Sequence, residues 1–388
     1  MKKIAAFLTA LIMFTAVVAG MHVYGVKQIN TRTSQMGTWN NLYKYASHDA
    51  VASNLDNKTI LTFGSSEFNH SVKTPFYPKK VFKDQDVTPM IMGSAFSQSL
   101  THTIALGGLE RSMKKRKVVL IVSPQWFNKE GVRPEAFALR FSESDYTAML
   151  QNSRLSFSLR KSIADRTEKL LSKDATLKAR VKKYNKVYLY KRGNPWDKIS
   201  CRMRGLFVSE KDRLCVLTAM RSSRIKKGSE KAISGESPDW KLLEGEADQY
   251  EKKRSTNQFY MRDKTFRKKI LRIMKKKKDS DKGRSYGSSP EYDDLKIFLE
   301  LCRERNIEPL LILPPVNGYW YDYTGFPKEG REAFYKKTAA LAEEYGAKTA
   351  DLSKYEYTPY FMQDAVHYSG KGWVKVNEEI YKFSKENN

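Results

Sequence analysis

The sequence predicts a three-layer α/β fold with a mainly parallel sheet. Short apolar runs that suit buried strands alternate with stretches that suit helices, the pattern of a sheet covered by helices on both faces. The clearest run is Val118–Val122, which is apolar throughout, as a parallel strand buried on both sides would be. Two features modify this plan. An apolar N-terminus predicts a transmembrane helix, and a long basic segment in the middle of the chain predicts a helical insertion on the sheet.

The N-terminal apolar run extends from Ile4 to about Val26 and follows two lysines. Its length is near the ~20 residues that a membrane-spanning helix needs. A cleaved signal peptide would end at small residues within the run, whereas a retained anchor would use all of it with the lysines inside. Because the apolar character continues past the possible cleavage site, with Tyr24 at an interfacial position, we expect an uncleaved anchor in residues 1–26. Residues 27–388 would then form a catalytic domain outside the cell membrane.

The first strand of the domain is predicted at Thr59–Phe63, after a polar stretch in residues 27–57 that reads as a stalk or a first helix. Gly64, Ser65 and Ser66 follow this strand directly. A serine at the end of a strand, on a turn that glycine accommodates, is where α/β hydrolases expose a nucleophile. The alternative is an ordinary strand-to-helix loop in which Ser66 caps the helix.

Two further turns are predicted in the sheet domain. Small residues at 92–98 suit a tight turn, and a helix through Leu100, Ile104 and Leu109 follows them. Val118–Val122 leads into Ser123–Gln125, at the carboxyl end of a strand, where open α/β sheets place their ligands.

The segment from residue 128 to about 289 is dense in charge and poor in periodicity, and we interpret it as a helical insertion. Its densest basic run is Lys275–Lys278, and Trp196, Trp240 and Tyr260 are interspersed. Basic residues with aromatic neighbours also occur in nucleic-acid-binding proteins. No nucleic-acid-binding motif accompanies them here, so we interpret the lysine run as a solvated face and expect no nucleic-acid partner.

The alternation of elements resumes at residue 290. The expected elements are a helix with Ser289 as cap and Pro290 in its first position, a strand at 309–313, a helix at about 331–345, a last strand at 347–352 and a closing helix around Trp373.

Asp364 and His367 lie between the last strand and the closing helix. A nucleophilic serine needs a base to remove its proton, and the base needs a carboxylate to orient it. Ser66 and this loop both follow strands, so a parallel sheet brings them to the same edge. Without Ser66, the simpler interpretation is a capping Asp364 and a surface His367, which is one of five histidines.

An early Gly-x-Ser and a late Asp-x-x-His resemble the SGNH hydrolase superfamily, in which the triad Asp and His share one late loop. Ser65 stands where that superfamily usually has Asp. With the apolar N-terminus and residues 123–127 (Ser-Pro-Gln-Trp-Phe), the pattern resembles the DltD family of D-alanyl-lipoteichoic acid biosynthesis proteins. The resemblance implies an SGNH-hydrolase-like fold and a triad in which Ser66 is the nucleophile, His367 the base and Asp364 its orienting carboxylate.

The resemblance also implies an oxyanion hole and an activity. Gly93 would supply one N–H group, and Gln125 would stand in for the usual Asn of the third sequence block. The activity would be serine-dependent acyl transfer or ester cleavage in the D-alanylation of lipoteichoic acid. The family's partners would be a membrane-bound O-acyltransferase and a D-alanyl carrier protein, and no cofactor or metal is expected.

Two other functions fit the same residues. One is an SGNH-like esterase or polysaccharide O-acetyltransferase, which would use the same triad. The other is a non-catalytic adaptor that binds an anionic polymer and presents it to a membrane-bound O-acyltransferase.

The amino-acid composition limits the class of protein and the kind of partner that these functions can involve. The chain has 388 residues and 40% hydrophobic content, enough for a real core, which excludes a disordered chain. Its net charge of +27 indicates an anionic partner: nucleic acid, anionic lipid or a polyanionic polymer. The 3 cysteines are too few for a disulfide framework or a zinc site, although Cys201 and Cys215 could pair.

Overall fold

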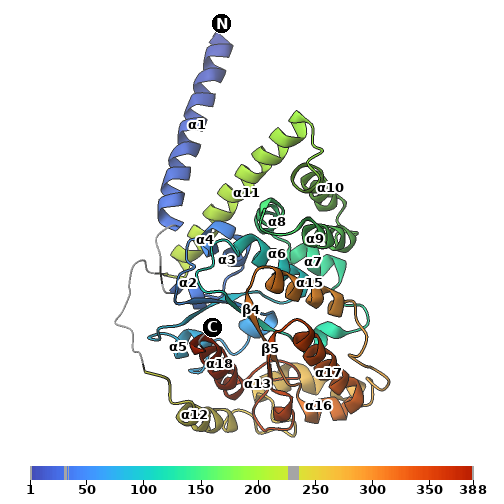
Figure 1. The fold of residues 1–388 in the computed structure, drawn as a ribbon. Helices are drawn as coiled ribbons and strands as arrows, with labels where there is room; N and C mark the ends of the chain where they lie inside the picture. Colours follow the sequence, from blue (N-terminus) through green and yellow to red (C-terminus); the bar gives the residue numbers. More distant parts are fainter. Residues whose placement is uncertain (1, 30–32, 34, 226–235, 387–388) are drawn as a thin grey trace.

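The computed structural model contains a five-stranded parallel sheet with helices on both faces, which confirms the predicted α/β fold (Figure 1). It describes residues 2–29, 33, 35–225 and 236–386. The strands, in the spatial order β2-β1-β3-β4-β5, are all parallel to their neighbours, and they are β1 (Thr59–Phe63), β2 (Thr88–Met92), β3 (Lys117–Ile121), β4 (Glu308–Leu313) and β5 (Lys348–Asp351).

This strand order creates a topological switch point between β1 and β3. From β1 the chain moves outward to β2, and it then returns to the other side of β1 to form β3. Connections therefore leave the carboxyl ends of β1 and β3 in opposite directions, which opens a crevice where doubly wound sheets bind ligands. The residues that follow these two strands begin with Gly64 and Val122.

Alternate side chains of the strands enter two separate apolar cores. Leu61, Phe63 and Leu120 belong to one core, which is covered by α6 (Ser99–Leu109), α15 (Glu291–Glu304) and α17 (Lys328–Glu344). Ile60 and Val119 belong to the other, which is covered by α5 (Pro78–Val81) and α18 (Gly370–Lys385). Burial on both faces explains why β1, β3 and β4 are mainly apolar runs, whereas the edge strand β5 has only Ala350 buried and is mostly polar.

The described part of the expected insertion is helical. Its α-helices are α7 (Pro134–Arg140), α8 (Glu143–Gln151), α9 (Phe157–Leu170), α10 (Ala175–Tyr184), α11 (Pro195–Ser222), α12 (Trp240–Lys252), α13 (Asp263–Thr265) and α14 (Leu271–Lys277). Residues 226–235 of this segment lie outside the described residues. The side chains of α8 that face α6, among them Tyr146 and Met149, are fully buried in the same core as the sheet. The insertion is thus packed into the domain, and the predicted solvated lysine run lies largely exposed in and just after α14.

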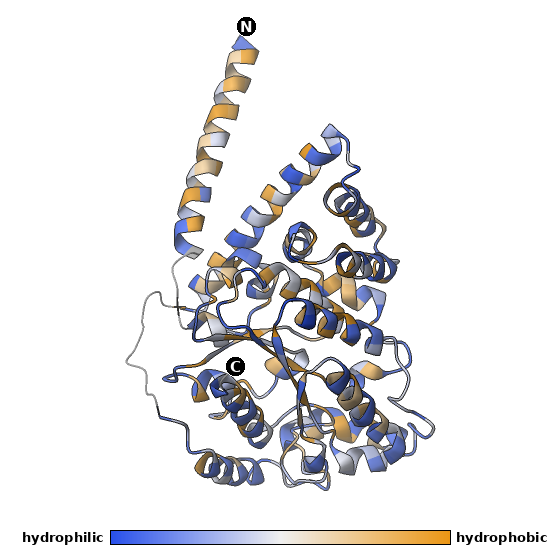
Figure 2. Ribbon diagram, in the orientation of Figure 1, coloured by the Kyte–Doolittle hydropathy of each residue, from blue (hydrophilic) through white to orange (hydrophobic). Residues whose placement is uncertain are grey.

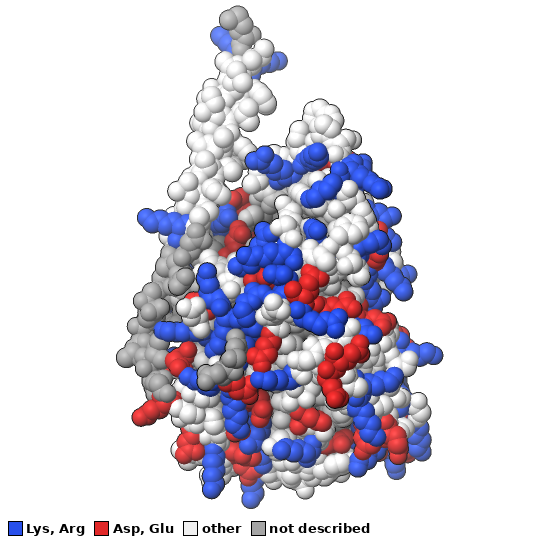
Figure 3. Space-filling model, in the orientation of Figure 1, with Lys and Arg blue, Asp and Glu red and all other residues white. Residues whose placement is uncertain are grey.

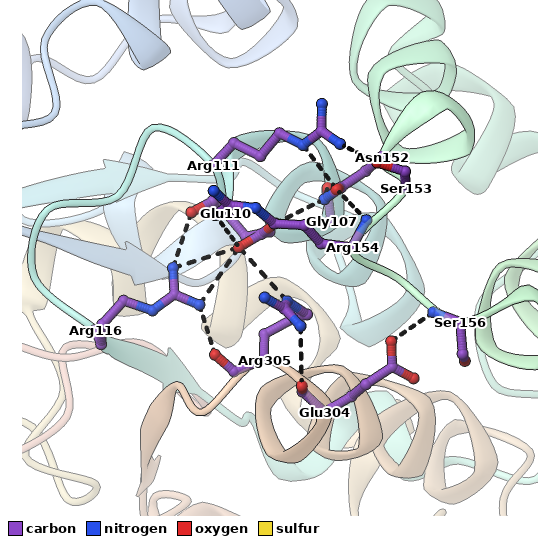
Figure 4. Close-up of polar contacts among 10 residues, drawn as sticks. All are labelled: Gly107, Glu110, Arg111, Arg116, Asn152, Ser153, Arg154, Ser156, Glu304 and Arg305. Atoms are coloured by element: carbon purple, nitrogen blue, oxygen red, sulfur yellow. Dashed lines mark hydrogen bonds and ion pairs between the residues drawn. The ribbon is translucent and has the colours of Figure 1, made fainter.

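A polar cluster around Glu110 joins the insertion to the sheet layer (Figure 4). Its buried carboxylate accepts a hydrogen bond from Asn152 Nδ2 at 2.9 Å and lies 3.4 Å from Arg116 Nη2. Arg305 and Arg154 are 3.7 Å and 3.9 Å away. The Glu110 carboxylate therefore contacts three segments: the residue before β3, the residues before β4 and the loop between α8 and α9. Its removal would leave several cations without their partner.

The N-terminal helix α1 (Lys2–Ile29) extends away from the domain (Figures 1 and 2). Residues Lys2–Gln28 have a mean hydropathy of 2.3 over their most apolar window, and the helix is long and apolar enough to cross a membrane. Residues 35–52 form the short helices α2 (Gln35–Thr38), α3 (Leu42–Ala46) and α4 (His48–Ala52). Met36 and Ala50 are fully buried, so the described part of this segment is packed against the domain and is not a stalk.

Two local expectations are corrected. Cys201 and Cys215 lie on the same helix, α11, where 14 positions correspond to about 21 Å, so they cannot pair. All three thiols are free. Helix α15 begins at Glu291 with Pro290 at its N-cap, one residue later than predicted, and Ser289 Oγ accepts a hydrogen bond from the Glu291 amide at 3.2 Å.

Candidate active site

The turn after β1 presents Ser66 at the carboxyl edge of the sheet. Ser66 begins a 3₁₀ helix, Ser66–Asn69, immediately after the strand and Gly64. The Ser65 amide donates a hydrogen bond to Glu67 Oε1 at 2.6 Å, which folds the turn back on itself. A Cβ at Gly64 would lie 2.4 Å from the same oxygen, so this tight turn requires glycine.

The loop after β5 holds Asp364 and His367. Asp364 Oδ1 accepts backbone hydrogen bonds from Val366 at 3.0 Å and from His367 at 2.9 Å. The backbone of Gln363 donates to the His367 carbonyl at 2.8 Å, which closes the base of the loop. Asp364 is not the cap of the following helix, because Ser369 is the N-cap of α18. Its carboxylate instead closes a turn within the loop and also contacts the imidazole ring of His367.

The three side chains form a continuous hydrogen-bonded relay. His367 Nδ1 lies 2.9 Å and 3.0 Å from the two oxygens of Asp364, and His367 Nε2 lies 2.8 Å from Ser66 Oγ. A carboxylate can only accept, so Nδ1 carries the proton. The unprotonated Nε2 of a neutral ring then faces the Ser66 hydroxyl, which is the geometry of a general base beside its nucleophile.

Charge and burial shift the pKa values of His367 and Asp364 in the direction that proton transfer from Ser66 to His367 requires. Burial alone lowers the pKa of His367, but the charge and hydrogen bond of Asp364 outweigh it, and the net pKa is raised. Burial raises the pKa of Asp364, but the His367 charge and hydrogen bonds lower it more, so the carboxylate stays ionised. An ionised Asp364 favours the imidazolium that forms when His367 accepts a proton.

A second histidine, His70, lies against the relay. Its ring stacks on that of His367 with a centroid distance of 3.6 Å and an interplanar angle of 15°. His70 Nδ1 donates to the Ser66 carbonyl at 2.7 Å. Burial and the neighbouring His367 charge lower the pKa of His70, so this ring is held neutral and packs against one face of the His367 ring.

Glu67 is a buried carboxyl beside Ser66. Burial raises its pKa to about 7. Its Oε1 holds the Ser65 amide, while Oε2 has no hydrogen-bond partner among the residues that the structure describes. The sequence interpretation missed Glu67 and His70. Their proximity to Ser66 in the chain was the available signal, but an acid and a histidine one and four residues after a serine are also common in solvated turns.

The two residues expected in the oxyanion hole, Gln125 and Gly93, lie differently with respect to the Ser66 cavity. Gln125 lies in the 3₁₀ helix Pro124–Phe127 after β3 and lines the same cavity as Ser66, with a buried Oε1 that lacks a partner among the described residues. Gly93 directly follows β2 with a φ of +133°, and a Cβ there would lie 1.9 Å from the Gly64 carbonyl oxygen. Gly93 thus packs against the turn that carries Ser66, and its part in an oxyanion hole stays a prediction.

The Ser66 cavity has a volume of about 980 Å³. Its wall combines aromatic side chains, Phe96 and Trp126, with basic side chains of the insertion and its end, Lys129, Arg133 and Arg284. Such a cavity suits a ligand with both apolar and anionic parts.

The side chains of His70, Asp364 and His367 also lie within the spacing of a metal site, since one ligand atom of each falls within 4.8 Å of the others. Both ring nitrogens of His367 already face Asp364 and Ser66. The contacts therefore favour a proton relay at this position.

Comparison with known proteins finds a family model that covers all three residues of the relay. Residues 35–385, which include the whole relay, match the family model described as DltD protein. The chain belongs to the DltD family. It is 34% identical to Protein DltD of Bacillus subtilis (strain 168) over 334 residues, 83% of this chain and 81% of the relative.

Two more distant members of the DltD family match a similar span. Protein DltD of Staphylococcus aureus (strain NCTC 8325 / PS 47) is 28% identical over 336 residues, 85% of this chain and 82% of the relative. Protein DltD of Lacticaseibacillus rhamnosus is 27% identical over 328 residues, 83% of this chain and 76% of the relative. The resemblance read from the sequence is therefore confirmed at the level of the family.

Proposed function

We propose that this chain is a membrane-anchored acyltransferase or esterase that acts outside the cell in the D-alanylation of lipoteichoic acid. The observation that carries the proposal is the relay from Asp364 through His367 to Ser66, at the switch point of the sheet in a DltD-family chain. Helix α1 would hold the domain at the outer face of the membrane. The partners would be a membrane-bound O-acyltransferase and, on the inside, a D-alanyl carrier protein.

The reaction would proceed in two steps through Ser66. In the first step, Ser66 Oγ attacks the carbonyl carbon of an activated D-alanyl group while His367 Nε2 takes the hydroxyl proton, and that proton passes to the leaving group. In the second step, His367 removes the proton of an acceptor hydroxyl, whose oxygen attacks the acyl-serine. The proton returns to Ser66 as the new ester leaves. With water as acceptor, the same steps give ester hydrolysis.

Preorganised donors would stabilise the negative oxygen that forms in each step. The Ser66 amide is the first candidate because it lies at the start of the 3₁₀ helix, and Gly93 and Gln125 would supply further donors. The basic side chains around the cavity, Lys129, Arg133 and Arg284, would attract the phosphates of the polymer that carries the acceptor hydroxyl.

The deciding experiment measures D-alanine ester on cell-wall polymer in cells that carry Ser66→Ala as the sole copy of this protein. We expect the ester to be lost, and Ser65→Ala is the matched control because it alters the adjacent hydroxyl and should retain a substantial part. The double variant Ser66→Ala/His367→Ala should be little worse than either single variant, because the residues act as a unit. Full esterification in Ser66→Ala would leave the non-catalytic adaptor as the better explanation.

A serine-reactive fluorophosphonate probe tests the nucleophile without assuming a substrate. Peptide mass spectrometry should find the label on Ser66, and labelling on Ser65 would overturn the assignment. Which ester is formed or cleaved from purified polymer and acyl donors then separates D-alanyl transfer from a polysaccharide O-acetyltransferase or a general esterase.

A further inference from the structure

Helix α11 carries an apolar face that is exposed to solvent in the structure. The exposed fractions along its first half are 79% for Trp196, 52% for Ile199, 61% for Met203, 54% for Leu206 and 58% for Phe207. At 3.6 residues per turn these five positions fall within about 100° of the helix circumference. We call them the α11 apolar face. A contiguous exposed face of this kind marks an interaction site in soluble domains.

The opposite side of α11 is fixed to the domain. Cys201 and Val208 are buried in the protein interior, with exposures of 1% and 3%. The orientation of the helix about its own axis is therefore set by the core, and the α11 apolar face must point outward. Rotation of α11 to hide that face would expose these buried side chains instead.

Helix α11 meets α1 at a polar contact. His22 of α1 pairs with the Glu210 carboxylate, and Arg213 Nη1 lies 3.2 Å from His22 Nδ1. Arg213 also packs on Gly25, where a Cβ would lie 2.6 Å from its side chain. From this contact both helices extend to the same side of the molecule, away from the sheet, and diverge (Figure 1). Glu210 lies on the same side of α11 as the apolar face.

This contact sets the level of the membrane surface if α1 spans the bilayer. The 20 positions from Lys2 to His22 correspond to about 30 Å of helix, the thickness of the hydrocarbon core. Ionised pairs are costly inside hydrocarbon, so the Arg213–Glu210 ion pair beside His22 belongs at the outer boundary. The α11 apolar face begins within one turn of Glu210 and continues toward the membrane side.

Basic residues flank the apolar face. Lys191, Arg192, Lys198 and Arg202 are exposed around the N-terminal end of α11. Figure 3 shows basic side chains gathered at this end of the molecule. An apolar face with Trp and Phe, bordered by Lys and Arg, is the composition of a helix that lies in a membrane interface and contacts anionic lipid headgroups.

We propose that the first half of α11, residues 195–207, lies in the outer surface of the membrane with its apolar face in the boundary between headgroups and acyl chains. The proposal rests on the anchoring role given above to α1. A single spanning helix lets a domain tilt and rotate, whereas a second contact on α11 fixes its orientation. The Ser66 cavity would then keep a constant height and direction relative to lipid-linked polymer.

The test uses the intrinsic fluorescence of Trp196 in the full chain. The other tryptophans are shielded, since Trp39, Trp126, Trp320 and Trp373 are buried and Trp240 is half-buried. The full chain is reconstituted into phosphatidylcholine vesicles with and without phosphatidylglycerol, with bromine at shallow or deep acyl positions. The signal of Trp196→Phe is subtracted. We expect at least two-fold quenching of Trp196 by shallow bromine, less by deep bromine, and more with phosphatidylglycerol present.

Two variants sharpen the test. Ile199→Asp/Met203→Asp places charges in the apolar face without touching the relay and should abolish the quenching, while fluorophosphonate labelling of Ser66 in detergent stays unchanged. Leu271→Asp is the matched control, because Leu271 is 51% exposed on α14, outside the α11 apolar face, and this variant should quench as the unmodified chain does.

Resistance to carbonate extraction, measured on the same vesicles, separates this proposal from the anchoring role of α1. Carbonate-resistant protein with unquenched Trp196 would overturn the α11 contact and leave the anchor intact. Protein that carbonate removes would overturn the anchor and the α11 contact together. Neither result affects the assignment of Ser66, which the labelling experiment decides by itself.

Discussion

At the scale of single residues, the proposed chemistry depends on how Asp364 controls the charge of His367. His367 must be neutral to accept the Ser66 proton, so the rate of Ser66 acylation should fall as pH decreases through the raised pKa of His367. Asp364→Asn removes the charge that raises this pKa and leaves burial, which lowers it. We expect the acid limb of the rate profile to move to lower pH while the maximal rate drops by roughly 10³- to 10⁴-fold.

The measurement is the rate of fluorophosphonate labelling between about pH 5 and pH 9. Ser65→Ala serves as the control and should keep the acid limb of the unmodified protein. An acid limb that moves to higher pH in Asp364→Asn, or that does not move, would contradict the proposed control of His367 by Asp364.

His70 allows a second prediction at this scale. Because its neutral ring stacks on His367 and donates to the Ser66 carbonyl, His70→Ala should slow labelling by about ten-fold through a less ordered base. His70→Phe keeps an aromatic ring in the stack and should recover part of the loss. Removal of the His70 ring should also shift the acid limb of the pH profile for Ser66 labelling. A general loss of folded protein would lower the rate at every pH and leave that limb in place. Equal rates in His70→Ala and the unmodified chain would refute a positioning role.

At the scale of elements, the turn that carries Ser66 depends on the close approach of β1 and β2. Gly93→Ala would place a methyl group 1.9 Å from the Gly64 carbonyl oxygen at a φ of +133°, so the two strand ends would have to separate. We expect a loss of stability of about 3 kcal/mol or more and loss of Ser66 labelling. Gly346→Ala is the matched control, because its φ is +68° with open space around it, and it should cost only about 1 kcal/mol. Denaturant unfolding measures both, and similar midpoints would contradict the packing argument.

Helix α1 carries the other prediction at this scale. Its apolar character continues through the possible cleavage site, and its last turns pair with α11 through His22 and Glu210. A retained helix keeps these contacts, whereas cleavage near Met21 would remove most of the apolar run. Intact mass or N-terminal sequencing of protein from membranes should therefore show the full N-terminal segment, and a mature chain that starts near Met21 would refute retention.

At the scale of the whole molecule, the net charge of +27 predicts how the protein meets its polymer. Many Lys and Arg contacts with a polyphosphate chain are screened together, over ~10 Å at ~0.1 M salt. Binding of purified lipoteichoic acid should therefore weaken steeply as salt rises, while fluorophosphonate labelling of Ser66, which needs no polyanion, should change little. Titration calorimetry or filter binding across salt concentrations measures this, and a flat response would argue against an electrostatic contribution of the basic surface.

The sequence by itself determined those elements of the sheet domain that a residue pattern within one short segment predicts. Four of the five strands are recognisable: β1, β3 and β4 as apolar runs buried on both faces, and β5 as the short segment after the predicted helix with Gly346 at its end. Ser66, Asp364 and His367 are recognisable because each follows a predicted strand, Ser66 close to a glycine and Asp364 and His367 three residues apart. The DltD family follows from the order of these motifs.

The tertiary structure alone decided the features that depend on distant residues. β2 was missed because its apolar run, Pro89–Met92, is short and poor in β-branched residues, and its place at the edge follows only from the pairing of the whole sheet. The stacking of His70 on His367 joins segments that are far apart in the chain. Burial of Glu67, which raises its pKa to about 7, comes from packing around the turn and not from the neighbouring sequence. The outward direction of the α11 apolar face was also decided by packing, because that helix is apolar on two sides and the core selects which side is buried.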